Sequence, residues 1–337
     1  MADPPINIAV IGVGAFGRNH ARVYRELEQQ GQPVRLVAVV DTDISVSRKI
    51  AEGFQVPAFA SIDELLSSNT KIHAASVAVP TIAHLQAAKS VMEAGGDVLI
   101  EKPVANTIAE ADELIRIAEK NRRIAQVGHV ERFNPAVRAT VPLITRPMFF
   151  EVHRLSVFTP RSLDVDVVFD LMIHDLEIVL SFVNSPVKEV RAVGLPILSG
   201  KVDIANVRVE FESGCIANFT ASRVSTERVR KLRFFQPQQY ISVDYGRQDV
   251  LVFSVGQDSS GSPPANPQIS MNKPAVPSEE PLQAELKAFI HAVHTRSKPL
   301  VSLHDGRRAL ALALDIASAI QEHRKKIDLE GVTATGQ

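Results

Sequence analysis

The chain has 337 residues, and chains longer than about 250 to 300 residues usually divide into domains, so two domains are expected. Its 37 lysines and arginines nearly balance its 38 aspartates and glutamates. This balance excludes a strongly basic field for nucleic acid or an anionic membrane, and it leaves small molecules as the expected partners.

The first predicted strand, residues 6–11, runs directly into the pattern G-x-G-x-x-G. In this pattern the first glycine permits a tight turn, the second lets the backbone approach a pyrophosphate, and the third lets the following helix pack closely on the strand. The phosphates then lie at the N-terminus of that helix. The turn therefore predicts a dinucleotide-binding site that includes Gly12, Gly14, Ala15, Phe16 and Gly17.

A second apolar run, residues 34–40, ends in Asp41, which lies 24 residues after Gly17. An acid at this spacing is expected to bind the ribose hydroxyls of the cofactor. Its carboxylate would repel a 2′-phosphate, and no arginine follows it closely, so the pattern favours NAD over NADP. The alternative is that Asp41 caps the next predicted helix, residues 45–52.

Apolar runs and helix-like stretches alternate up to about residue 127. Short runs that are apolar throughout are typical of a parallel sheet whose two faces are both covered by helices. We therefore expect residues 1–127 to form a dinucleotide-binding α/β domain of the Rossmann type, with a doubly wound parallel sheet. Its further strands are expected at residues 74–79, 98–100 and 124–127, and its crossover helices at residues 82–94 and 108–121.

The pattern changes after residue 147, where apolar and polar residues begin to alternate. Residues 207–211 alternate in this way before a turn into residues 215–222, which predicts a half-buried hairpin. Residues 128–305 are therefore expected to form an α+β domain with a largely antiparallel open sheet. Its further strands are expected at residues 149–156, 187–195, 231–236, 240–245 and 250–255.

Residues 256–281 are rich in proline, serine and glycine, which predicts an irregular excursion. Two helices are expected after it, at residues 282–295 and 306–325. The second has apolar residues on every side between residues 309 and 320, so we expect it to be buried and joined to the first domain.

Lys102 follows the predicted strand at residues 98–100 and stands in the sequence Glu-Lys-Pro. It is therefore expected at the carboxyl edge of the parallel sheet, where open α/β folds bind their ligands. An ammonium group beside a nicotinamide can stabilise an alkoxide or relay a proton as a secondary alcohol loses hydride. The alternative is an ordinary surface lysine.

Asp170 and His174 lie four residues apart in a helix-like stretch, so their side chains are expected on one face. A carboxylate beside an imidazole fixes its tautomer and favours its protonated form, which suits histidine as the base that removes an alcohol proton. The pair has two alternatives, a contact that only stabilises the helix and a pair of metal ligands. The chain lacks HExxH and a cysteine cluster, so no metal is expected.

Five motifs of the chain together resemble the Gfo/Idh/MocA oxidoreductase family. They are the glycine turn, Pro80 with His84, Glu101-Lys102-Pro103, residues 128–135, and Asp170 with His174. The resemblance implies a Rossmann domain followed by an α+β domain whose open sheet often makes the oligomer interface. It implies acid-base roles for Lys102 and His174, assisted by Asp170, and it implies that Pro80, His84 and Glu101 lie around the cofactor.

Within this family, residues 128–135 and 174–180 are similar to those of bacterial enzymes that oxidise the 3-hydroxyl of UDP-N-acetylglucosamine. A nucleotide sugar carries a diphosphate, which needs cations and preferably arginine forks. The candidate substrate-binding residues are Arg132, Asn134 and Arg161. A further basic cluster either contacts the diphosphate or forms solvated strand and turn faces. Its members are Arg223, Arg228, Arg230, Lys231 and Arg233.

These features predict an NAD-dependent dehydrogenase that oxidises a secondary hydroxyl of a nucleotide sugar, with C3 of UDP-N-acetylglucosamine as the most specific version. One alternative is a dehydrogenase of a free hexose or an inositol-like polyol. An alternative of another class is a sensor that binds NAD(H) without catalysis. Such a sensor has no need for Lys102, Asp170 and His174 together.

The expected partners are the sugar substrate and further copies of the chain, as a homodimer or homotetramer through the C-terminal sheet, with no nucleic acid and no membrane. A single cysteine, Cys215, excludes an internal disulfide. The first residues lack a charged stretch followed by an apolar one, and no apolar run approaches the roughly 20 residues that span a bilayer. We therefore expect a cytoplasmic protein.

Overall fold

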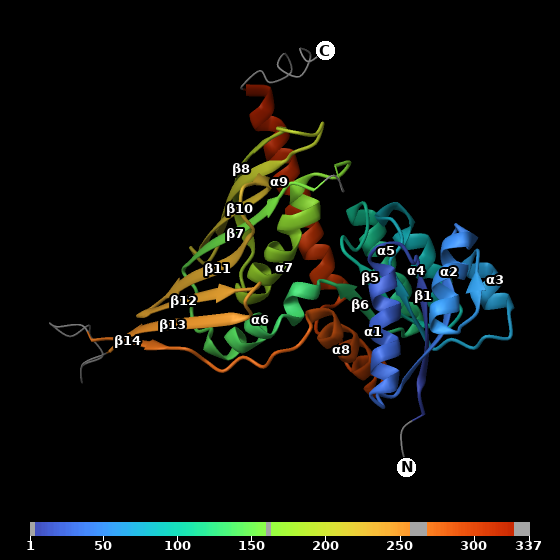
Figure 1. Cartoon of the computed structure of the whole chain (residues 1–337). Coiled ribbons are helices and arrows are strands. Elements are labelled where there is room, and N and C mark those ends of the chain that lie inside the picture. Colours follow the sequence, from blue (N-terminus) through green and yellow to red (C-terminus); the bar gives the residue numbers. More distant parts are fainter. Residues whose placement is uncertain (1–3, 160–162, 257–267, 327–337) are drawn as a thin grey trace. The chain divides into compact units, whose positions relative to one another are not determined.

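The computed structural model describes residues 4–159, 163–256 and 268–326 (Figure 1). The chain divides into two compact units. The first is built from the chain up to Phe133 together with Glu279–Leu310. The second is built from Asn134–Ser278 together with the chain from Ala311 onward.

The first unit contains a six-stranded parallel sheet with the strand order β3-β2-β1-β4-β5-β6. The strand β1 (Ile6–Ile11) pairs with β2 (Val34–Val40) on one side and with β4 (Ala74–Val77) on the other. The chain therefore winds outward in both directions from β1, which confirms the predicted Rossmann fold. The other strands are β3 (Ala58–Phe59), β5 (Asp97–Glu101) and β6 (Ala125–Gly128).

Helices connect these strands because each intervening stretch has an apolar side that the sheet can bury. Helix starts follow from local sequence, as at Thr107, which forms a capping box with Glu110. The helices are α1 (Gly17–Gln29), α2 (Ile44–Phe54), α3 (Ile62–Ser67), α4 (His84–Glu93) and α5 (Ile108–Asn121), with 3₁₀ turns η1 (Thr81–Ala83) and η2 (Val130–Phe133).

The helix α8 (Pro281–Thr295) also belongs to the first unit, which differs from the prediction that assigns residues 128–305 to the second domain. Leu286 and Phe289 of α8 are fully buried in the same core cluster as Tyr24 of α1. Truncating a buried phenylalanine to alanine typically costs about 3 to 5 kcal/mol, so a helix that contributes such side chains is part of the core.

The second unit contains an eight-stranded sheet with the order β14-β13-β12-β11-β7-β10-β9-β8. Its neighbouring pairs are antiparallel except β7 with β10, which confirms the predicted largely antiparallel sheet. The predicted hairpin is formed by β9 (Ile204–Phe211) and β10 (Ile216–Ser225). The other strands are β7 (Phe149–Val157), β8 (Val187–Leu195), β11 (Val229–Gln236), β12 (Gln239–Asp244), β13 (Asp249–Val255) and β14 (Ile269–Asn272).

The two faces of this sheet differ. Phe150 of β7 and Phe234 of β11 are fully buried and stack with ring centroids 5.4 Å apart. Helices of the same unit lie on this side (Figure 1). They are α6 (Pro135–Thr140), α7 (Ile173–Phe182) and the later part of α9 (Leu303–Lys326), together with the 3₁₀ turn η3 (Val141–Leu143) and a π-helix at Val168–Met172.

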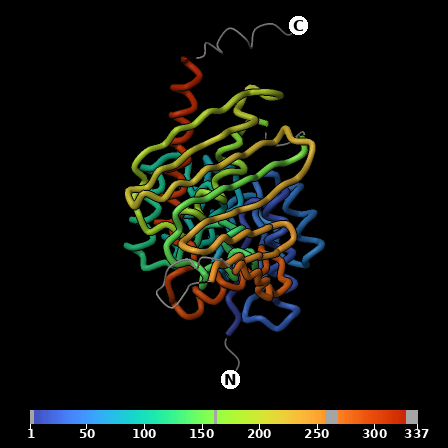
Figure 2. Tube along the Cα trace, turned by 90° about the vertical axis from the view of Figure 1, so that its left-hand side faces the viewer, coloured from blue at the N-terminus to red at the C-terminus, as the bar shows by residue number. Residues whose placement is uncertain are grey.

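The opposite face of the sheet is turned toward the viewer in Figure 2. It carries a row of aromatic side chains. Phe149, Phe235, Tyr240 and Phe253 stand opposite one another on four neighbouring strands. Their successive ring centroids are 5.7, 4.9 and 5.4 Å apart. These side chains are half-buried or exposed, so this aromatic row is an apolar strip on the open face.

Two predictions for the last third of the chain are corrected. The stretch 256–281 contains the strand β14, although its residues 257–267 lie outside the described residues. The helix α9 is not buried on every side, since Asp315 and Ser318 are exposed. It is also joined to the first unit only up to Leu310, and its longer part belongs to the second unit. Within the described residues, no helix has both the length and the apolar character needed to cross a membrane.

Candidate active site

Two of the three glycines in the turn between β1 and α1 have no room for a side chain. Gly12 has a φ of +83°, and a Cβ there would lie 2.6 Å from a carbonyl oxygen of the loop after β4. A Cβ on Gly17 would lie 1.8 Å from the Gly12 carbonyl oxygen. A Cβ on Gly14 would meet no described atom within 4 Å, and its neighbours Ala15 and Phe16 are exposed. The space beside Gly14 fits the approach of a pyrophosphate to the N-terminus of α1.

Replacing Gly14 with valine is expected to weaken NAD binding and leave the fold intact. The new side chain would enter the space of the pyrophosphate without striking a described residue of the chain. We expect the Kd for NAD to rise at least about tenfold and the Tm to stay within about 2 °C, as calorimetric titration and thermal unfolding would measure. Gly12→Val is the matched control and should lower the Tm. An unchanged Kd in Gly14→Val would contradict this placement of the cofactor.

Asp41 stands just after β2 and contacts the glycine turn directly. Its Oδ2 accepts a hydrogen bond from the Val13 amide at 2.9 Å, and its Oδ1 accepts one from the Asp43 amide at 3.0 Å. The alternative role as a helix cap is taken by Asp43, whose side chain accepts from the Ser45 amide at 2.9 Å at the start of α2. Asp41 is thus held beside the turn, where a ribose is expected to bind.

Lys102 is the first residue beyond the carboxyl end of β5, as the sequence predicts. Its positive charge interacts electrostatically with His129. His129 follows the neighbouring strand β6 and is fully buried. Burial, and then the charge of Lys102, lower the pKa of His129 to about 3. His129 is therefore a neutral imidazole at physiological pH. It lies in a family motif, but sequence analysis assigns it no role.

The free energy of unfolding is expected to fall as the pH decreases from about 6.5 toward 3, because folded His129 resists protonation. The unfolded chain binds a proton at this histidine with a pKa of about 6.5, so acid favours unfolding by about 2 kcal/mol at pH 5. His129→Gln should flatten this dependence in urea denaturation series. His153→Gln, which changes a half-buried histidine of β7, should keep the wild-type slope. Equal slopes in His129→Gln and the wild type would contradict the prediction.

Glu101, which the family resemblance places near the cofactor, directs its carboxylate toward α1. Its Oε1 lies 3.0 Å from Nε2 of His20, and His20 is fully buried. A Cβ on Gly128 of β6 would lie 2.6 Å from the same carboxylate. Glu101 therefore ties the end of β5 to α1, and its contact with a cofactor stays a prediction.

Glu285 of α8 joins His20 and Glu101 in a buried group that no sequence motif indicates. In the described part of the chain, these three residues have donor atoms close enough to hold a metal ion, within 4.8 Å of one another. Two buried carboxylates at such a distance require a proton or another cation between them. The geometry of the group does not by itself imply a metal.

His84, at the start of α4, links two loops at the carboxyl edge of the sheet. Its Nε2 lies 3.0 Å from the Val79 carbonyl oxygen, and its Nδ1 lies 2.9 Å from that of Pro103. Burial lowers the pKa of this imidazole. His84 thus anchors the loop that contains Lys102. Pro80 is exposed in the other loop, and cofactor contacts of both residues stay predictions.

In the second unit, Asp170 and His174 lie on either side of a change in helix type. Asp170 stands in the π-helix Val168–Met172, and His174 stands in the first turn of α7. The sequence predicts one continuous α-helix here, and the π turn is the correction. Both side chains are partly exposed, whereas the next six residues of α7 are buried. Single π turns often occur at functional sites, and this one contains Asp170 and ends two residues before His174.

Asp175, beside His174, is buried and forms a pair that sequence analysis does not identify. Arg154 of β7 donates to it through Nε at 2.6 Å and through Nη2 at 2.9 Å. The Arg154 guanidinium also lies 5.3 Å from the centre of the Tyr245 ring. This bidentate ion pair fixes the first turn of α7 to the sheet.

The three predicted substrate-binding residues have different positions. Arg132 lies in η2 of the first unit. Asn134 caps α6, accepting from the Ala136 amide and donating to the Tyr245 carbonyl oxygen, both at 3.1 Å. Arg161 lies outside the described residues. Substrate contacts of all three stay predictions.

The basic cluster of residues 223–233 divides between the interior and the surface. Arg223 is buried, with its Nε 3.7 Å from Oδ1 of Asp203. Lys231 and Arg233 lie on the open sheet face, 4.0 and 3.8 Å from acidic side chains of neighbouring strands, and Arg228 is exposed in a turn. Arg230 is partly exposed at the start of β11. A shared diphosphate contact of the cluster stays a prediction.

Comparison with known protein families gives two matches. Residues 6–129 match a model described as an oxidoreductase family with an NAD-binding Rossmann fold. Residues 146–240 match a model described as a GFO/IDH/MocA C-terminal domain.

Individual relatives cover almost the whole chain. A UDP-N-acetylglucosamine 3-dehydrogenase from Acidithiobacillus ferrooxidans is 34% identical over 93% of this chain and 96% of its own. A solved structure of that enzyme has a TM-score of 0.86 and covers 95% of this chain and 99% of its own, at 32% identity. A myo-inositol 2-dehydrogenase from Thermotoga maritima is 24% identical over 97% of this chain and 99% of its own.

Proposed function

Because the chain belongs to the Gfo/Idh/MocA oxidoreductase family, we propose that it is an NAD-dependent dehydrogenase of a nucleotide sugar. Its proposed substrate is UDP-N-acetylglucosamine, which it oxidises at C3 to a 3-keto sugar. The observation that carries this proposal is the 34% identity to the Acidithiobacillus ferrooxidans enzyme with that activity in its name, over 93% of the chain.

The residues of the first unit fit NAD. The open space at Gly14 and the N-terminus of α1 suit the pyrophosphate, and the Asp41 carboxylate suits a ribose without a 2′-phosphate. NAD, when bound, accepts the hydride from the substrate carbon. Residues of the chain then have to accept the hydroxyl proton.

Oxidation of a secondary alcohol removes a hydride from carbon and a proton from oxygen, and the products are a ketone, NADH and a proton. We assign the hydroxyl proton to His174, with Asp170 favouring the protonated imidazole. Lys102 supplies a positive charge for the developing alkoxide. Each of the three residues has its own role in this reaction. A protein that binds NAD(H) without catalysis needs none of these roles.

A second candidate substrate class is a free polyol or hexose, which the likeness to the Thermotoga maritima myo-inositol 2-dehydrogenase favours. This substrate has no diphosphate, so it makes no demand on Arg132 or on the basic cluster.

The first test is NADH formation at 340 nm with purified protein, NAD and a trap for the keto product. The substrates are UDP-N-acetylglucosamine, UDP-glucose, free N-acetylglucosamine, glucose and myo-inositol. We expect turnover with UDP-N-acetylglucosamine that is lost in His174→Ala and Lys102→Ala. Turnover on free sugars alone would overturn the nucleotide-sugar substrate and keep the dehydrogenase. NAD binding without turnover on any substrate would favour a sensor of NAD(H).

We also infer that the chain forms a homodimer or homotetramer through the open face of the second unit's sheet. The aromatic row of Phe149, Phe235, Tyr240 and Phe253 on that face supports this inference, because stacked aromatic side chains are enriched in interfaces. Light scattering measures the oligomeric state directly. A cytoplasmic location stays a prediction from the sequence.

A further inference from the structure

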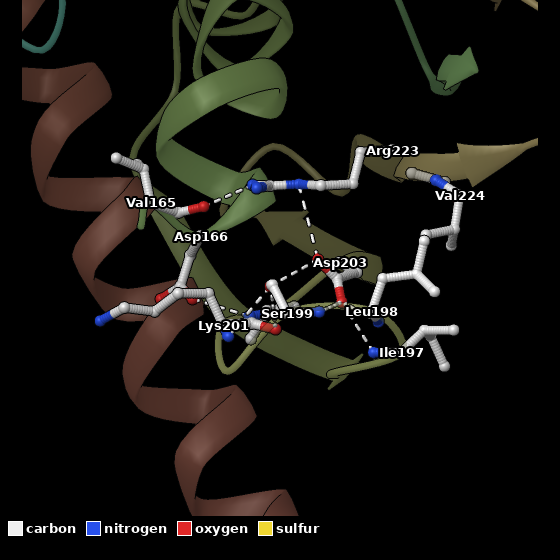
Figure 3. Close-up of polar contacts among 11 residues, drawn as sticks. Val165, Asp166, Ile197, Leu198, Ser199, Lys201, Asp203, Arg223 and Val224 are labelled. Carbon is white, nitrogen blue, oxygen red and sulfur yellow. Dashed lines mark hydrogen bonds and ion pairs between the residues drawn. The ribbon is translucent and has the colours of Figure 1, made fainter. Parts of the chain in front are cut away.

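Asp203 is a fully buried carboxylate at the end of the loop between β8 and β9 (Figure 3). Its Oδ2 accepts hydrogen bonds from the amides of Ile197, Leu198 and Ser199 at 2.7, 2.7 and 2.8 Å. Its Oδ1 accepts from the Ser199 hydroxyl at 2.7 Å. Burial by itself raises the pKa of Asp203, but these bonds outweigh it and lower the pKa below its ordinary value. The loop is therefore closed around one ionised side chain.

Arg223 connects this carboxylate to a second segment. It comes from β10, and its Nε lies 3.7 Å from Oδ1 of Asp203. The backbone also joins the two residues, since the Arg223 amide donates to the Asp203 carbonyl oxygen at 3.0 Å. At its other end, Nη2 of Arg223 donates to the carbonyl oxygen of Val165 (Figure 3). Arg223 is thus a buried bridge.

The segment after Val165 is held from the same loop. The Val202 amide donates to Oδ1 of Asp166 at 2.8 Å, and the Val167 amide donates to the Val202 carbonyl oxygen at 2.9 Å. The carbonyl oxygen of Asp166 then accepts from the amides of two residues of the π-helix, one of them Asp170, both at 3.0 Å. Three consecutive residues before the π-helix are therefore bound to the loop or to Arg223.

From this arrangement we propose that Asp203 and Arg223 are positioning residues for Asp170 and His174. They hold residues 165–167, and these residues determine where the π-helix starts and how its side chains emerge. The catalytic part of the proposal rests on the proposed dehydrogenase function. The effect on the π-helix does not, and it can be measured without a substrate.

Asp203→Asn is a sharp test because it removes the negative charge that faces buried Arg223. In one orientation the amide nitrogen meets three backbone amide donors. In the other it faces Arg223, and the Ser199 hydroxyl has to turn and accept instead of donate. Arg223→Lys is the second variant, since it keeps the charge with fewer donors. Glu210→Gln is the matched control, because it removes a carboxylate from the exposed Lys188 pair in the same hairpin.

Hydrogen exchange is the first measurement. We expect amides of residues 165–174 to exchange at least about tenfold faster in Asp203→Asn than in the wild type, and at the wild-type rate in Glu210→Gln. Unchanged protection of this segment in Asp203→Asn would overturn the proposal, whatever substrate the protein takes. If the wild type has no turnover on any substrate, the dehydrogenase function fails and the exchange result still decides whether the loop holds the π-helix.

Steady-state kinetics well below the Tm is the second measurement. We expect kcat to fall about 10- to 100-fold in Asp203→Asn, with the KM for NAD within about twofold of the wild type, because small displacements of catalytic groups have effects of this size. Arg223→Lys should recover part of the lost kcat relative to Arg223→Gln. A kcat for Asp203→Asn equal to that of the wild type would overturn the positioning role. A rise in the KM for NAD as large as the fall in kcat would also overturn it.

Discussion

Replacing His174 with glutamine is expected to lower kcat by about 100- to 10,000-fold while the Kd for NAD stays within about twofold. Glutamine has a similar size and can form hydrogen bonds, but it takes up no proton at neutral pH. The loss therefore measures proton transfer rather than shape. NADH formation at saturating substrate gives kcat, and calorimetric titration gives the Kd.

His153→Gln is the matched control for this change, since it replaces another partly buried histidine of the second unit. It should leave kcat unchanged. A kcat for His174→Gln within about threefold of the wild type would remove His174 from the proton-transfer step. Loss of folding in His174→Gln alone would instead assign the residue a structural role.

Replacing Asp175 with leucine is expected to destabilise the chain by about 3 to 5 kcal/mol, because it leaves the buried Arg154 guanidinium without its carboxylate. Urea-induced unfolding measures this loss as a lower midpoint at constant slope. The double variant Arg154→Met with Asp175→Leu should regain much of the loss, since both charges of this pair are then removed.

The exposed pair of Lys188 and Glu210 supplies the comparison for this prediction. Glu210→Gln should leave the unfolding midpoint unchanged, because solvent screens exposed pairs. If Asp175→Leu also left the midpoint unchanged, the pair with Arg154 would contribute nothing to stability. If the double variant were as unstable as Asp175→Leu, the loss would come from packing and not from the uncompensated charge.

The parts of the fold that depend on local sequence could be predicted well. The apolar run before Gly12 is a strand because its residues are buried on both faces of a covered sheet. A glycine turn that directly follows such a strand is typical of a dinucleotide-binding site. Lys102 could be placed at the carboxyl edge of the parallel sheet because it follows a predicted strand closely in the sequence. The hairpin at residues 207–222 follows from its alternation of apolar and polar residues.

The parts that depend on distant packing could not be predicted. Nothing around Glu285 indicates that α8 meets α1, so the group with His20 and Glu101 is found only in the folded chain. The burial of Arg223 is equally invisible, because a lysine- and arginine-rich stretch looks like a solvated surface. The π turn at Asp170 adds one residue to a helical turn, and hydrophobic periodicity does not resolve such a change.

The packing of α8 against α1 also has a consequence for the order of synthesis. Chains fold as they leave the ribosome, and N-terminal domains usually fold first. Here the first unit lacks Leu286 and Phe289, two fully buried members of its core, until the whole sheet of the second unit has been translated. A nascent chain released before α8 therefore has an incomplete first unit, so a truncation that removes α8 damages both units.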